Sequence, residues 1–261
     1  MTKVYFLDDR EAPWFPDPLA TDPDGLVAIS ETLGTERLIL AYQKGIFPWL
    51  KMGEYPLWHW FSPDPRFLLY PTEFRLSRSL KKAVKDNRFS IRINQNFRQT
   101  MKECAQSKRP DQESTWIEDD MIEDYCTLNQ LGIAHSIEAY HENKLVGGLY
   151  GLFLGQSFFG ESMFHHESEA SRVALAALVD YSLKHKFDFI DCQVESSHLT
   201  SLGARLVDRT AFEGQLENAI DEDMDQVKKI ISGNPPNTAH RVPWQNALPE
   251  STAHLYRGPS L

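Results

Sequence analysis

The chain has 261 residues, of which 41% are hydrophobic and 25% charged, and its formal net charge is −10. This composition is typical of a globular protein with one large or two modest domains, and the negative charge argues against a general nucleic-acid-binding protein. We expect no signal peptide, because charges and four prolines occupy the first 25 residues, and no membrane span, because the longest apolar run, 173–179, is too short. Three cysteines without metal-ligand spacing favour a reduced, cytoplasmic protein without disulfides.

Residues 1–34 are rich in Pro, Asp and Gly, and we expect irregular structure there. Thr35 caps a predicted helix with an apolar face, and Gly45 ends it. Pro48 then favours an extended turn that presents Trp49. The sequence therefore predicts a helix followed by an exposed indole.

Two closely spaced prolines, Pro63 and Pro65, mark a predicted domain boundary. We expect an N-terminal domain of residues 1–64 and a second domain of residues 65–261. Hydrophobic periodicity and turn residues predict the following elements of the second domain: a basic helix from Ser77 or Ser79 to Asp86, a strand 89–93, a helix from Asp119 to Gly132, strands 135–140, 144–154 and 157–164, a helix 170–184, a strand 187–194, a short helix 198–202, a solvated acidic helix 214–225, and a tail after Pro235 with little regular structure.

These elements predict an α/β (α+β) fold with a mixed sheet. Three strands in a row form antiparallel neighbours, and the helix 170–184 then crosses over to the strand 187–194. A right-handed crossover makes the strands that it joins parallel, and a cleft opens at their carboxyl ends. The end of the strand 187–194 is therefore expected at a cleft.

Polar residues stand at the ends of two predicted strands. Glu161, in "GESMF", follows two phenylalanines, and Asp191 and Gln193, in "DCQV", end the last strand. On a regular strand, side chains two residues apart share a face, so Asp191 and Gln193 are expected to point the same way. The alternatives are a salt-bridged or edge-exposed Glu161, and a pair that only holds the next helix in place.

Charge and aromatic residues indicate a polyanionic partner. From Arg66 to Lys102 there are ten Lys or Arg and only two acidic residues, a net charge of +8, which leaves −18 for the rest. Trp49 and Trp116 lie in predicted loops, where indoles can sandwich a nucleobase. The simpler alternatives are a basic surface helix without a nucleic-acid partner and tryptophans that close local apolar clusters.

Motifs of several other enzyme classes are missing. The sequence has no Walker loop, no G-x-G-x-x-G, no G-x-S-x-G, and no Gly-rich loop after Phe164 to hold a pyrophosphate. His165 and His166 are adjacent, which suits surface residues better than one metal site. Cys192 is interpreted as a core residue. We therefore expect no metal and no cofactor.

Eight motifs occur in one order along residues 24–204: "LILAYQKGIFPW", "FSPDPR", "STWI", "AHSIE", "LVGGLYG", "FFGESMF", "IDCQV" and "HLTSLGA". Together they closely resemble the leucyl/phenylalanyl-tRNA–protein transferase family of bacteria. The resemblance implies a small N-terminal domain beside a GNAT-like domain. It also implies transfer of Leu, Phe or Met from aminoacyl-tRNA to proteins that begin with Arg or Lys, which marks them for degradation by the N-end rule. The family suggests a monomer.

The resemblance also implies roles for individual residues. Asp191 and Gln193 would be the catalytic pair, facing the ester carbonyl and the incoming amine, with Gln193 orienting the amine and Asp191 stabilising charge. Trp49 and Trp116 would bracket the terminal adenosine of tRNA, and Glu161 would hydrogen-bond near its ribose, whose 2′-hydroxyl is a candidate proton shuttle. The pocket for the aminoacyl side chain would consist of Leu149, Phe158, Met163, Leu175, Leu178 and Ile190. The acceptor-stem phosphates would meet Arg75, Arg78, Lys81, Lys82 and Lys85.

Three other functions remain open at this point. An acyl-CoA-dependent GNAT-type N-acyltransferase shares the expected fold, but the missing pyrophosphate loop counts against it. A non-catalytic tRNA- or degron-binding module is disfavoured by the intact Glu161, Asp191 and Gln193. A transferase that builds peptidoglycan cross-bridges from aminoacyl-tRNA differs in its acceptor. The sequence also departs from the family at Leu178, where Phe is expected, and this departure predicts a wider pocket.

Overall fold

The computed structural model describes residues 4–52, 56–107 and 116–220. Among these residues, four strands form a first sheet in the order β1-β2-β4-β3, with β1 parallel to β2 and the other neighbours antiparallel. The elements of this region are β1 (Tyr5–Leu7), β2 (Leu26–Ser30), α1 (Thr35–Gln43), β3 (Phe47–Met52), β4 (Leu57–Phe61) and a 3-10 turn at Pro18–Ala20. The expectation of irregular structure in residues 1–34 holds for most of residues 8–25 and 31–34 but is wrong at β1 and β2, which bury Leu7, Val27 and Ala28 in the core.

A second, mixed sheet contains seven of the described strands, in the order β11-β5-β10-β9-β8-β7-β6. Only β9 and β10 are parallel neighbours, and α5 connects them, as predicted. The two mixed sheets with their helices confirm the α/β (α+β) class. The strand bounds are β5 (Arg66–Leu69), β6 (Ser90–Ile93), β7 (Ala134–His141), β8 (Lys144–Leu154), β9 (Ser157–His165), β10 (Phe189–Asp191) and β11 (Arg205–Val207).

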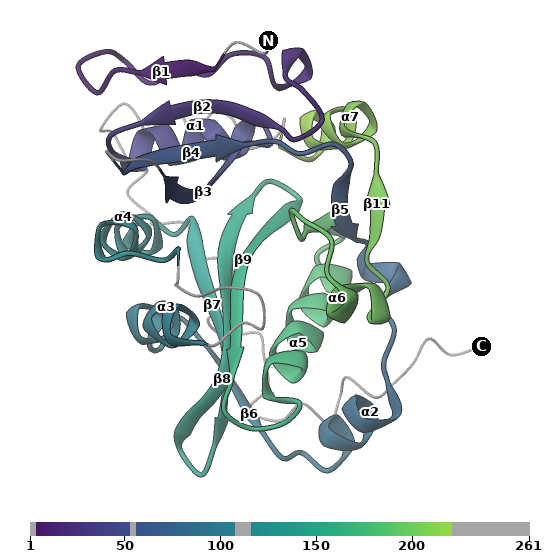
Figure 1. Cartoon of the computed structure of the whole chain (residues 1–261). Helices are drawn as coiled ribbons and strands as arrows, with labels where there is room; N and C mark the ends of the chain where they lie inside the picture. The colour runs from purple at the N-terminus through teal and green to yellow at the C-terminus, as the bar shows by residue number, and fades with distance from the viewer. Residues whose placement is uncertain (1–3, 53–55, 108–115, 221–261) are drawn as a thin grey trace.

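Helices cover both faces of the second sheet (Figure 1). The helices α3 (Phe97–Gln106) and α4 (Asp119–Gln130) pack on one face, while α5 (Ala170–Lys184) packs on the other and carries α2 (Arg78–Lys85) beside it. The chain then continues through α6 (Ser197–Ser201) and α7 (Arg209–Ile220), with a 3-10 turn at Pro71–Glu73 before α2. No helix in the described part of the chain is long and apolar enough to cross a membrane.

Two apolar clusters fill the spaces on either side of the second sheet. Successive side chains of a strand enter different clusters: Phe159 and Phe189 belong to the cluster that α1, α3, α4 and α7 share, whereas Phe158 and Ile190 belong to the cluster beneath α5. This alternation is the period of two that a sheet buried on both faces requires. The predicted domain boundary at residue 64 falls between β4 and β5, which belong to different sheets, while the first cluster contains side chains from both sides of it.

Two predicted elements near the chain's end differ from the structure. The strand expected to run to residue 194 ends at Asp191, because Gln193 has a φ of 64° and leaves the extended conformation. The acidic helix expected at 214–225 begins earlier, at Arg209, and is not solvated on all sides, because Phe212 and Leu216 are buried. The tail after residue 235 lies outside the described residues.

Candidate active site

The parallel pair β9 and β10 separates at one end of the sheet. Their pairing stops where Asp191 lies opposite Phe159, but β9 continues as far as His165. Beyond this point the chain after β10 turns away into α6. The carboxyl end of β10 therefore lies beside a stretch of β9 that β10 no longer covers, which is where a crossover fold places its ligand site.

Glu161 occupies an irregular position on this stretch of β9. Gly160 pairs with Gly151 of β8 and Ser162 pairs with Tyr150, so Glu161 is the extra residue of a β-bulge. A bulge changes the direction of the side chain that it carries and often lies next to a functional site. Here it directs the Glu161 carboxylate toward the helices α1 and α4 instead of along the regular face of the strand.

Three polar side chains surround the Glu161 carboxylate. Its Oε1 accepts hydrogen bonds from the Tyr42 hydroxyl at 2.6 Å and from Nε2 of Gln193 at 2.7 Å, and its Oε2 accepts a longer bond of 3.3 Å from the Tyr125 hydroxyl. Glu161 is 8% exposed. Burial raises the pKa of this carboxyl to about 7, although the three donors act in the opposite direction.

Gln193 joins the two strand ends through its side chain and its backbone. Its carboxamide nitrogen donates to Glu161, and its backbone N–H donates to Oδ1 of Asp191 at 2.8 Å. The positive φ of Gln193 permits both contacts, because an extended residue would continue the strand. In the described part of the chain, no donor binds the carboxamide oxygen of Gln193.

The Asp191 carboxylate binds Arg66, whereas the Gln193 carboxamide binds Glu161. Both oxygens of Asp191 bind the guanidinium of Arg66, with distances of 2.9 and 3.1 Å to Nε and 2.6 Å to Nη2. The rings of Phe47 and Phe212 lie 4.8 and 4.6 Å from the guanidinium carbon, and Nη1 of Arg66 donates a hydrogen bond to the Gly45 carbonyl. The structure therefore places Asp191 behind Gln193, against a buried arginine.

The six side chains expected to form the aminoacyl pocket lie together in the cluster beneath α5. Leu149 pairs with Met163 across β8 and β9, and Phe158 pairs with Ile190 across β9 and β10, while Leu175 and Leu178 come from α5. Five of them are buried and Met163 is half-buried. Met163, the half-buried member, is on the stretch of β9 that continues past β10, two residues after Glu161.

Trp49 and Trp116 lie on segments that one lysine connects. Lys51 Nζ binds Glu118 and Asp120 at 2.7 Å each, which ties the end of β3 to the beginning of α4. Each tryptophan lies two residues before a member of this ion-pair group, and both are half-buried against the first cluster. The two indoles therefore lie on neighbouring segments.

The structure separates the basic segment into two parts. Arg66, Arg88 and Arg98 pair with Asp191, Glu167 and Glu123. In contrast, the five residues expected at the acceptor stem are exposed, and no carboxylate of the described residues forms a salt bridge with them. They lie on α2 and just before it: Arg75, Arg78, Lys81, Lys82 and Lys85.

The sequence did not indicate three residues of the site. Tyr42 and Tyr125 fall within predicted helices to which the sequence assigns no function, and Arg66 is counted with the basic segment. A charged residue at the start of the apolar strand β5 was a usable signal for Arg66, because a buried charge needs a partner. Within the described ranges, no group of three His, Cys, Asp or Glu side chains lies together as metal ligands do.

Two family models match consecutive parts of the chain. The model described as leucyl/phenylalanyl-tRNA protein transferase matches residues 68–217, and the model described as the N-terminal domain of the same protein matches residues 31–64.

Curated relatives carry the same description. A leucyl/phenylalanyl-tRNA–protein transferase of Dechloromonas aromatica is 49% identical over 195 residues, which cover 75% of this chain and 82% of the relative. One from Desulfatibacillum aliphaticivorans is 45% identical over 218 residues, which cover 84% of this chain and 92% of the relative. Among solved structures, a GCN5-related N-acetyltransferase-like protein from Streptococcus suis is 14% identical, with a TM-score of 0.32 and coverage of 69% of this chain and 68% of that chain.

Proposed function

The chain belongs to the leucyl/phenylalanyl-tRNA–protein transferase family, and from this premise we propose that it moves Leu, and also Phe or Met, to the α-amine of proteins that begin with Arg or Lys. Members of the family are aminoacyltransferases that take the amino acid from aminoacyl-tRNA. We further propose that the product is a substrate for N-end rule degradation in the cytoplasm, and that the enzyme acts as a monomer without a cofactor.

The observation that carries this proposal is the position of the Gln193 carboxamide. It follows β10, is hydrogen-bonded to Glu161, and comes directly after Cys192, which packs against the apolar cluster beneath α5. An aminoacyl ester with its side chain in that cluster presents its carbonyl to the strand end. A carboxamide oxygen there accepts a hydrogen bond from an N–H group of the acceptor amine. This bond directs the amine nitrogen toward the ester carbonyl.

The reaction needs orientation more than activation. The amine nitrogen forms a bond to the ester carbonyl carbon, the bond from that carbon to the ribose oxygen breaks, and the proton that the nitrogen loses ends on the ribose oxygen. An α-amine with a pKa of about 8 is partly neutral near pH 7, and alignment of the two groups supplies much of the rate. The ribose 2′-hydroxyl is the proposed proton shuttle, and Glu161 the group that hydrogen-bonds near that ribose.

We assign Asp191 an indirect part in this reaction. Its carboxylate is fully buried against Arg66 and accepts the backbone N–H of Gln193. These contacts support a role in holding the backbone of Gln193 in its left-handed conformation, while the negative charge of the pair is balanced by Arg66. Gln193 then remains as the member of the pair that contacts the amine.

The donor is recognised at three places. The apolar cluster accepts the aminoacyl side chain, and a pocket of this kind distinguishes apolar side chains by only about 1–3 kcal/mol, so Leu, Phe and Met can share it. Trp49 and Trp116 stack on the terminal adenosine. The exposed basic residues of α2 bind acceptor-stem phosphates, and the excess negative charge outside the basic segment favours acceptors with a basic first residue.

The proposal is tested by transfer of labelled leucine from leucyl-tRNA to two peptides that differ only in their first residue, Arg or Ala. We expect wild type to label the Arg peptide alone and Gln193→Ala to lose most of this activity. The matched control is Gln99→Ala, because Gln99 also donates to a glutamate, Glu103 at 2.7 Å, but on the exposed surface of α3. Asp191→Ala is a poorer test, because it leaves Arg66 buried without a counter-charge.

Other results identify the alternatives. Labelling of neither peptide, with leucyl-tRNA still bound, indicates a binding module or an acceptor such as a muropeptide amine. Equal labelling of both peptides contradicts the proposed requirement for Arg or Lys as the first residue of the acceptor. Transfer from an acyl-CoA in place of leucyl-tRNA indicates a GNAT-type acyltransferase.

A further inference from the structure

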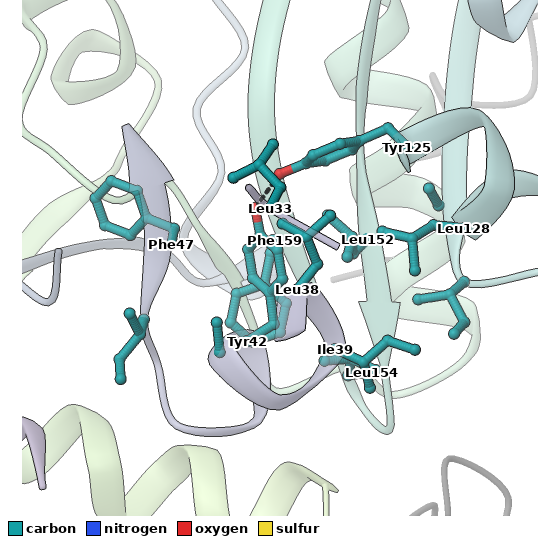
Figure 2. Close-up of a cluster of buried hydrophobic side chains, with 14 of the residues drawn as sticks. Leu33, Leu38, Ile39, Tyr42, Phe47, Tyr125, Leu128, Leu152, Leu154 and Phe159 are labelled. Atoms are coloured by element: carbon teal, nitrogen blue, oxygen red, sulfur yellow. Dashed lines mark hydrogen bonds between the residues drawn. The ribbon is translucent and has the colours of Figure 1, made fainter. Parts of the chain in front are cut away.

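Two buried tyrosines from different helices meet at the Glu161 carboxylate. Tyr42 comes from α1 and Tyr125 from α4, and their hydroxyl oxygens are 2.5 Å apart (Figure 2). Both side chains are fully buried. The carboxylate that they share is the one that binds Gln193, so the two helices reach the candidate catalytic residue through a single acidic group.

While Glu161 is ionised, both tyrosine hydroxyls direct their protons toward its carboxylate. Burial raises the pKa of Tyr42 and Tyr125 well above the usual value, so each hydroxyl keeps its one proton. Tyr42 donates its proton to Oε1 of Glu161, and Tyr125 donates to the Tyr42 oxygen, with the longer contact to Oε2 as its alternative. Every donor in the group is therefore directed toward the carboxylate.

This arrangement fixes the orientation of the Gln193 carboxamide. An ionised Glu161 only accepts hydrogen bonds, so Gln193 must present its NH₂ group to it, and its oxygen points away. A protonated Glu161 carries a donor, which can bind the carboxamide oxygen and reverse the amide. The direction in which the Gln193 oxygen points thus depends on Glu161 staying ionised.

The groups around Glu161 oppose each other. From α1 and α4 the tyrosine hydroxyls lower its pKa, while burial and the charge of Asp191 at the end of β10 raise it to about 7. Arg66 pairs with Asp191 and offsets part of that charge. The tyrosines, together with the Gln193 amide, are therefore the groups that favour the ionised form of the carboxyl.

We propose that Tyr42 and Tyr125 are positioning residues of the transfer reaction, which hold Glu161 as a carboxylate and so keep the oxygen of Gln193 turned toward the acceptor amine. The inference rests on the proposed function and adds one residue of α1 and one of α4 to its site. Tyr42 contributes more than Tyr125, because its bond to the carboxylate is direct and short.

The test measures single-turnover leucine transfer against pH for wild type, Tyr42→Phe and Tyr125→Phe, with the same Arg peptide at saturation. Loss of one donor to a charged group shifts a pKa by about 1–2 units. The acid limb of the profile is expected to move up by that amount in Tyr42→Phe and by less in Tyr125→Phe. Circular dichroism checks that each variant folds, and either folded variant is sufficient for the test.

The matched control is Tyr140→Phe. The Tyr140 hydroxyl also donates to a fully buried glutamate, Glu138, at 2.9 Å. Both residues are on β7, and Glu138 forms no hydrogen bond with Gln193 in the described part of the chain. This variant should keep the wild-type pH profile. A second measurement, carbon-13 NMR titration of the Glu161 carboxyl without substrates, reports the same pKa shift independently of activity. The Glu161 carboxyl resonance is identified as the one that is missing from the spectrum of Glu161→Gln.

Shifts of both the titration and the activity profile in Tyr42→Phe support the inference. A shifted titration with an unshifted activity profile overturns it, and so does an unshifted titration. If wild type transfers leucine to no acceptor, the proposed function is wrong, and the positioning role in transfer is wrong with it. A shifted Glu161 titration in Tyr42→Phe would then still confirm the hydrogen bonds between Tyr42, Tyr125 and Glu161.

Discussion

The guanidinium of Arg66 and the carboxylate of Asp191 form an ion pair in which neither side chain has any exposed surface, with Nη2 and Oδ2 2.6 Å apart. The pair connects the first residue of β5 to the last residue of β10, two strands that run antiparallel. The ion pair therefore joins two strands of the second sheet and also belongs to the candidate site, because Asp191 binds the backbone of Gln193.

Removal of one member of this pair should destabilise the protein strongly. Arg66→Ala leaves a buried carboxylate without its counter-charge, which typically costs about 3–5 kcal/mol in the free energy of unfolding. Urea denaturation measures this loss. Arg98→Ala, which breaks the exposed pair with Glu123, is the control and should leave the midpoint almost unchanged. A wild-type midpoint for Arg66→Ala would show that the ion pair contributes little.

The stability of the protein should depend on the ionisation of Glu161. Its pKa in the folded state, about 7, lies above the ordinary 4.5, so this group stabilises the fold fully below about pH 4.5 and loses that contribution as the pH rises through 7. Glu161→Gln removes the titration. The variant should therefore gain up to about 3 kcal/mol relative to wild type between pH 4.5 and pH 8. Urea denaturation at several pH values measures the difference, and a difference that does not change with pH contradicts the prediction.

The preference between donors should depend on Leu178. This side chain is fully buried in the cluster assigned to the aminoacyl group. Leu178→Phe fills space that a donor side chain needs, so transfer of Phe should fall more than transfer of Leu, by about 10-fold in the ratio of kcat/KM values. Competition between leucyl-tRNA and phenylalanyl-tRNA measures that ratio. An equal loss for both donors would indicate general overpacking.

Binding of tRNA should depend on the free charges of α2. Lys82 is exposed and forms no salt bridge with the described residues, so Lys82→Gln should weaken leucyl-tRNA binding and reduce the slope of log K against log salt by about 1. Arg98→Gln is the control, because Glu123 already neutralises Arg98. Titrations at four salt concentrations determine both slopes. Identical slopes for Lys82→Gln and wild type would exclude this helix from the tRNA site.

Local sequence patterns were sufficient for the elements around the crossover. The apolar run and its helical period placed α5 at Ala170–Lys184, and the parallel pairing of β9 with β10 followed from the crossover connection. The same patterns missed β1 and β2, because strands of three and five residues between prolines and aspartates are stabilised by pairing with distant segments, which no local pattern records.

The candidate site could be predicted in its composition but not in its geometry. The positions of Glu161, Asp191 and Gln193 at strand ends were visible in the sequence. Their directions were not, because they depend on a β-bulge at Glu161 and a positive φ at Gln193, and both are single-residue departures from the regular strand. The burial of Arg66 could not be predicted for a related reason, since its partner is 125 residues away along the chain.

Phe212 of α7 lies against the Arg66 guanidinium and covers one side of the ion pair behind Gln193. Protein synthesis runs from the N-terminus, so the ribosome has made every other residue of this site before it reaches Phe212. A nascent chain that ends before α7 therefore lacks the ring that covers this side of the Arg66 guanidinium. Of the side chains that pack on the Arg66 guanidinium, Phe212 is thus the last to be added during synthesis.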